Sequence, residues 1–110
     1  MSYKRITFQE DSELRKYLAE SGQFHERIVD LLVEHEKSHY DKSRELGYSP
    51  RYEVGFDTKM KRVVSISTII PPPISPEDDL EIALAPRLAS PGDVRAARHA
   101  VRRIRRALRR

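Results

Sequence analysis

The chain has 110 residues, of which 35% are charged and 7% aromatic, and it contains neither tryptophan nor cysteine. This length allows one domain with a modest core, and the missing cysteines exclude disulfides, thiolate catalysis and cysteine-based zinc sites. The net charge of +4 is unevenly divided: residues 1–90 carry 13 basic and 16 acidic side chains, net −3, whereas residues 91–110 carry eight arginines and one aspartate, net +7.

Two helices are predicted in the first half of the chain. Residues 3–8 alternate in polarity and form either a short strand or an ordered arm. Helical periodicity then covers residues 11–21 and, after Gly22, residues 23–46; Gly47 ends the second helix because glycine readily takes the left-handed conformation at a helix terminus. We expect the second helix to bury an apolar stripe formed by Phe24, Ile28, Leu31, Leu32 and Leu46.

In residues 51–70 the spacing of apolar residues changes from the helical period of about 3.6 to a period of two, which predicts an antiparallel β-hairpin. Three consecutive prolines then end the sheet, since proline cannot donate to the hydrogen-bond ladder, and we expect segment 71–76 to act as a stiff spacer. Residues 76–85 are ambiguous: a Ser-Pro helix start precedes leucine and isoleucine residues that alternate as they would in a strand.

The C-terminal helix, residues 91–110, has the clearest start signal. Ser90 supplies a hydroxyl N-cap, Pro91 suits the first helical position, and Asp93 places a carboxylate in the first turn. One side of this helix is apolar and carries Val94, Ala97, Val101, Ile104 and Leu108. The opposite side carries six arginines, which we name the arginine face: Arg95, Arg98, Arg102, Arg105, Arg106 and Arg109.

Together these elements predict an α+β fold. An N-terminal helical pair packs on a small antiparallel sheet, made of hairpin 51–70 with a possible extra strand. Residues 1–90 form the body of a single domain, and residues 91–110 add the amphipathic, arginine-rich C-terminal helix.

Residues 35–39, His-Glu-Lys-Ser-His, match the pattern H-E-x-x-H, in which two histidines one helical turn apart bind zinc and the glutamate activates a water. Over these five residues the chain resembles zinc metallopeptidases, although Lys37 and Asp41 differ from the residue types usual at their positions. No third ligand is evident from spacing, and Glu53, Asp57 or His99 would have to complete the site after folding.

The same two histidines have a simpler interpretation. His35 and His39 fall within the apolar stripe of their helix, which is typical of buried or half-buried histidines that hydrogen-bond a neighbouring element. The sequence favours this interpretation, so we predict no catalytic residue, no metal and no cofactor, with His35 and His39 as the weak candidates for a metal site.

The arginine face has more than one suitable partner, because the guanidinium fork binds phosphates and carboxylates alike. A nucleic acid would be held by its backbone without sequence preference, since the face lacks the amide and hydroxyl side chains that read bases. A second copy of the chain would build rings or filaments through an acidic counter-surface formed by Glu77, Asp78, Asp79 and Glu81. A solvated face with no partner is the remaining interpretation.

The sequence favours a non-enzymatic subunit of a homo-oligomer or larger protein complex that uses its C-terminal helix as the contact element. Nucleic-acid binding is the alternative, and a zinc hydrolase comes third. The expected architecture is similar to that of small phage neck and tail-completion proteins, a resemblance that implies a virion component. No run of about 20 apolar residues and no signal peptide is present, so we expect a cytoplasmic or virion protein with no membrane partner.

Overall fold

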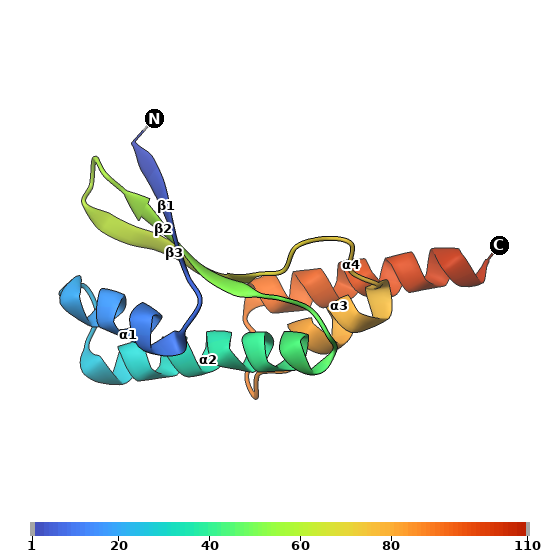
Figure 1. Cartoon of the computed structure of the whole chain (residues 1–110). Coiled ribbons are helices and arrows are strands. Elements are labelled where there is room, and N and C mark those ends of the chain that lie inside the picture. Colours follow the sequence, from blue (N-terminus) through green and yellow to red (C-terminus); the bar gives the residue numbers. More distant parts are fainter. Residues whose placement is uncertain (1, 110) are drawn as a thin grey trace.

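The computed structural model describes residues 2–109 and confirms the α+β class (Figure 1). The described residues form four helices and one three-stranded antiparallel sheet. In chain order the elements are β1 (Tyr3–Phe8), α1 (Asp11–Glu20), α2 (Glu26–Glu45), β2 (Arg51–Asp57), β3 (Arg62–Ile69), α3 (Pro76–Ala83) and α4 (Pro91–Leu108).

The sheet has the order β1-β2-β3, so residues 3–8 are its third strand and β3 is an edge strand. Part of the β3 edge is covered by a side chain. The Gln23 amide accepts a hydrogen bond from the Val63 N–H at 2.7 Å and donates one to the Val63 carbonyl at 2.9 Å. These are the two bonds that a neighbouring strand would make, so Gln23 closes the edge at this residue.

The core lies between the sheet and the antiparallel pair α1 and α2, which cover one face of it (Figure 1). Periodicity predicts the inward position of Leu14 and Leu18 in α1 correctly, since both are fully buried. The other buried residues of this core come from α2 and the sheet: Val29, Val33, Tyr52, Val54 and Val63.

The predicted inward stripe of α2 is wrong in part. Ile28 and Leu31 are 45% and 62% exposed, whereas Val29 and Val33 are buried. The sheet and α1 cover only the arc of α2 that carries the valines. The neighbouring larger apolar residues border a groove instead. A prediction from residue size and hydrophobicity alone therefore puts the buried side of α2 in the wrong place.

Residues 76–83 form a helix, which resolves the ambiguity at 76–85. The Ser75 hydroxyl accepts a hydrogen bond from the Asp78 N–H at 3.2 Å, and Pro76 occupies the first turn, so the start signal outweighs the strand-like alternation. Ile82 and Ala83 are buried because α3 packs between α2 and α4.

The apolar side of α4 belongs only partly to the fold. Ala97 and Ala100 are buried against the body, but Leu108 is 80% exposed, because the C-terminal half of α4 extends beyond α3 (Figure 1). The molecule is accordingly elongated, with extents of 50 × 30 × 23 Å. None of the helices between residues 2 and 109 combines the length and apolar character that crossing a membrane requires.

Candidate metal centre

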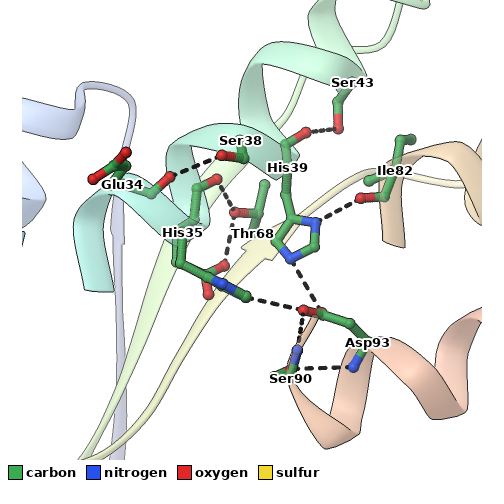
Figure 2. A network of polar contacts seen from close by, with 10 residues as sticks. Glu34, His35, Ser38, His39, Ser43, Thr68, Ile82, Ser90 and Asp93 are labelled. Atoms are coloured by element: carbon green, nitrogen blue, oxygen red, sulfur yellow. Dashed lines mark hydrogen bonds and ion pairs between the residues drawn. The ribbon is translucent and has the colours of Figure 1, made fainter. Parts of the chain in front are cut away.

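Helix α2 presents His35 and His39 on the same side, because residues four apart lie one above the other on a helix. Their ring centroids are 5.0 Å apart and the rings meet edge to face. Figure 2 shows both rings directed at the first turn of α4. Because of this direction, a third side chain, from α4, lies close to both rings.

The third side chain is Asp93, held in place by the start of α4. The Ser90 N–H donates to Asp93 Oδ2 at 2.9 Å, and the Asp93 N–H donates to Ser90 Oγ at 3.1 Å, so the two residues form a capping box. Both bonds restrict the Asp93 carboxylate to one orientation. Its Oδ2 lies 2.9 Å from His35 Nε2, and its Oδ1 lies 3.1 Å from His39 Nε2.

These three groups have the composition and spacing of a divalent-metal site. One donor atom from each of His35, His39 and Asp93 lies within 4.8 Å of the others. A tetrahedral zinc ion with bonds of about 2.1 Å holds its ligand atoms about 3.4 Å apart, so small outward movements of the side chains would admit the ion. Three protein ligands would leave the fourth position for water or substrate, as in catalytic zinc sites.

The hydrogen bond on the far side of His39 favours this interpretation. Its Nδ1 lies 2.7 Å from the carbonyl oxygen of Ile82, which can only accept, so Nδ1 carries the proton (Figure 2). A neutral ring then has a bare lone pair on Nε2, facing a carboxylate oxygen. Two acceptors at this distance repel each other unless the ring takes a second proton or a cation lies between them. A backbone carbonyl bound to the outer nitrogen is also the usual second-shell partner of a metal-bound histidine.

Glu36 lies between the two histidines in sequence and points toward the sheet. Its Oε1 accepts a hydrogen bond from the Thr68 hydroxyl at 3.0 Å. Burial raises the pKa of the Glu36 carboxyl above its ordinary value, although the Thr68 hydrogen bond and the nearby His39 and His35 oppose that rise. A carboxylate that protonates more readily than usual suits a general base working near neutral pH.

Asp93 has the opposite electrostatic balance. Burial raises the pKa of its carboxyl, but the hydrogen bonds with Ser90 and the positive potential of His39 and His35 together outweigh burial, so the pKa lies below its ordinary value. Asp93 therefore stays ionised at neutral pH, as a metal ligand must, while Glu36 is the carboxyl prepared to accept a proton.

Two grooves meet at His35. The first, of about 610 Å³, runs between α2 and the edge strand β3. Its lining includes His35 of the candidate metal site, its neighbour Glu36, and residues from α2, the segment before it and strand β3: Phe24, Ile28, Leu31, Leu32, Val63, Val64, Ser65 and Ile66. The second, of about 630 Å³, lies between α2 and the loop that joins α3 to α4, and it also contains Leu31 and His35.

The sequence does not indicate Asp93 as a candidate third ligand. Its position accounts for it as a helix-start residue, and nothing in its spacing shows that α4 begins beside α2. The three residues considered for that role lie elsewhere: Glu53 pairs with Arg5, Asp57 caps the turn between β2 and β3, and His99 is exposed on α4.

The six residues of the arginine face are all exposed. The acidic counter-surface lies on α3, directly beside α4 of the same chain. There the Asp79 carboxylate is 3.8 Å from the guanidinium of Arg103, and the Asp78 carboxylate accepts a hydrogen bond from the Tyr48 hydroxyl. The other two members, Glu77 and Glu81, are exposed.

Comparison with known proteins gives no relative: no family model matches the chain, and no curated protein or solved structure is significantly similar to it. The arguments about function therefore rest on the residues and their geometry.

Zinc is expected to bind at one ion per chain and to raise the melting temperature. At one hundred times the dissociation constant, an ion that binds only the folded chain stabilises it by about 2.7 kcal/mol, which raises Tm by roughly 10 °C. His35→Ala and Asp93→Asn should each lose this shift.

The matched control is His99→Ala, which removes an exposed histidine of α4 outside the cluster. It should keep the full stabilisation by zinc. Equal loss in His99→Ala and His35→Ala would show that the ion binds histidines unspecifically and would contradict the site.

Proposed function

We propose that the protein is a zinc-dependent hydrolase that cleaves peptide bonds. The observation that carries this proposal is the completion of the His35 and His39 pair by Asp93, at distances of 2.9 and 3.1 Å from the two Nε2 atoms. The sequence alone favours a non-enzymatic assembly subunit, because of its acidic body and its arginine face, and it indicates no third ligand for the histidine pair. Two imidazoles and one carboxylate are a donor set typical of catalytic zinc.

His35, His39 and Asp93 would hold the zinc ion, and Glu36, which lines the first groove together with His35, would act as the base. Zinc at this site would lower the pKa of a bound water and polarise the substrate carbonyl. Glu36 would accept the proton that the water loses as its oxygen bonds to the carbonyl carbon. Glu36 would then pass this proton to the amine nitrogen as the C–N bond breaks, which gives one carboxylic acid and one amine.

The grooves support a peptide as the substrate. Because both grooves contain His35, an extended chain that follows them would pass beside one side of the proposed metal site, with side chains on both sides of the scissile bond. Strand β3 offers backbone groups along the first groove, and beyond Val63 they are not covered by Gln23. An extended peptide can pair with such an edge, and the apolar row of α2 would take its apolar side chains.

Glu36→Gln is expected to keep zinc binding and the Thr68 hydrogen bond, because glutamine retains an acceptor oxygen of the same shape. Hydrolysis should fall about 100- to 10,000-fold, since the amide cannot accept the proton. Cleavage of a mixture of fluorogenic peptides by the zinc-loaded protein measures this, with chelator added in a parallel reaction.

The control for this variant is Glu45→Gln, the same change at an exposed position near the far end of α2. It should cleave as the natural chain does. Peptide hydrolysis that persists in Glu36→Gln, or in the presence of chelator, would contradict the hydrolase proposal even if zinc binds.

An assembly subunit stays our second proposal, supported by the exposed end of α4. The C-terminal half of α4 projects from the body (Figure 1), and on its apolar side Leu108 is 80% exposed, with arginines near it in the sequence. A second copy or another subunit could cover this side, which would bury Leu108 and bring the arginines near acidic groups.

Leu108→Asp is expected to dissociate such an assembly, because it would bury a carboxylate in the contact. Mass measurement in solution at low and high salt, on the natural chain and the variant, tests this. If the natural chain is monomeric at every salt and protein concentration, self-assembly is excluded.

A further inference from the structure

The arginine face of α4 is a surface that neither the metal centre nor the fold uses. Each of its six side chains is exposed, and within residues 2–109 none of them forms an ion pair or hydrogen bond. Arg103 is different: its guanidinium lies 3.8 Å from Asp79 and donates to the Ile74 carbonyl at 3.4 Å. The structure thus separates one arginine that ties α4 to α3 from six that face solvent.

Five of the six arginines form a line along the helix. Arg95, Arg98, Arg102, Arg105 and Arg109 follow steps of three and four residues, so they remain on one side of α4 from Arg95 to Arg109, a distance of 14 residue steps. At a rise of 1.5 Å per residue this line is about 21 Å long. One strand of B-DNA advances 3.4 Å per phosphate, so the line spans about six nucleotides.

The surroundings of the line favour phosphates over the carboxylates of another copy. The acidic cluster on α3 already uses Asp79 for Arg103 and Asp78 for Tyr48 within the chain. Of this cluster, a second copy would therefore offer only Glu77 and Glu81, and its other exposed carboxylates are spread over α1, α2 and the chain segments beside them. A nucleic-acid backbone supplies one charge per nucleotide at a regular spacing, and the guanidinium fork binds phosphate oxygens in pairs.

We propose that the arginine face binds the phosphate backbone of nucleic acid without sequence preference. No amide or hydroxyl side chain lies among the arginines between Arg95 and Arg109 to read base edges, so affinity comes from charge neutralisation. This proposal is independent of the hydrolase: it uses no residue of the metal centre and survives if the metal centre fails.

The test is a titration of unrelated labelled duplexes with the full chain at several salt concentrations. With four or five phosphates neutralised, the slope of log affinity against log salt is expected to be about −4, so a fourfold rise in salt weakens binding about 250-fold. The triple variant Arg98→Gln, Arg102→Gln and Arg105→Gln should bring this slope to about −1, because each lost contact removes about one unit.

The charge-matched control is Lys59→Gln, Lys61→Gln and Arg62→Gln, which removes three exposed charges at the turn between β2 and β3. It should keep a slope near that of the natural chain. Equal loss in the two triple variants would mean that net charge alone drives binding and would overturn the proposal.

Three further results would also overturn it. These are the absence of duplex binding at low salt, a preference for vesicles of anionic phospholipid over duplexes, and self-association that the arginine triple variant abolishes while no duplex is bound. The last result would assign the arginine face to a second copy of the chain instead.

Discussion

The orientation of His39 is the constraint on which the rest of the site depends. Its Nδ1–H is committed to the Ile82 carbonyl, so its Nε2 lone pair must face Asp93. The ring is buried and cannot turn away to find water. A cation, either a proton on the ring or a metal ion between the groups, is required to make that contact favourable. The packing of α3 against α2 therefore prepares the site before any ion binds.

Helix α4 links this site to the rest of the surface. Its first turn contains Asp93, which caps the helix and is the candidate third ligand, while its later turns carry the arginine face. Metal binding would tie the start of α4 to α2 by coordination in addition to packing. The proposed metal site, through Asp93, and the arginine face thus share helix α4, with no linker between them.

Much of the fold could be predicted from the sequence, because it depends on local signals. The change of period marked the hairpin, glycines marked the ends of the first two helices, and the cap at Ser90 marked the start of α4. The buried side of α2 was harder, since the larger residues Ile28 and Leu31 border a groove while Val29 and Val33 face the core. The local sequence pattern shows which residues are apolar, but which of them are buried depends on tertiary packing.

In the candidate site, too, the local features could be predicted from the sequence and the tertiary contacts could not. The spacing of His35 and His39 was visible, as was the role of Asp93 as a capping residue. Their meeting depends on how α3 and the loop after it return α4 to α2, which no local pattern encodes.

The most direct test of the metal site is diffraction from zinc-containing crystals at the zinc absorption edge. We expect one anomalous peak about 2.1 Å from His35 Nε2, His39 Nε2 and the Asp93 carboxylate. Direct histidine–aspartate hydrogen bonds with no peak between them would contradict the metal site.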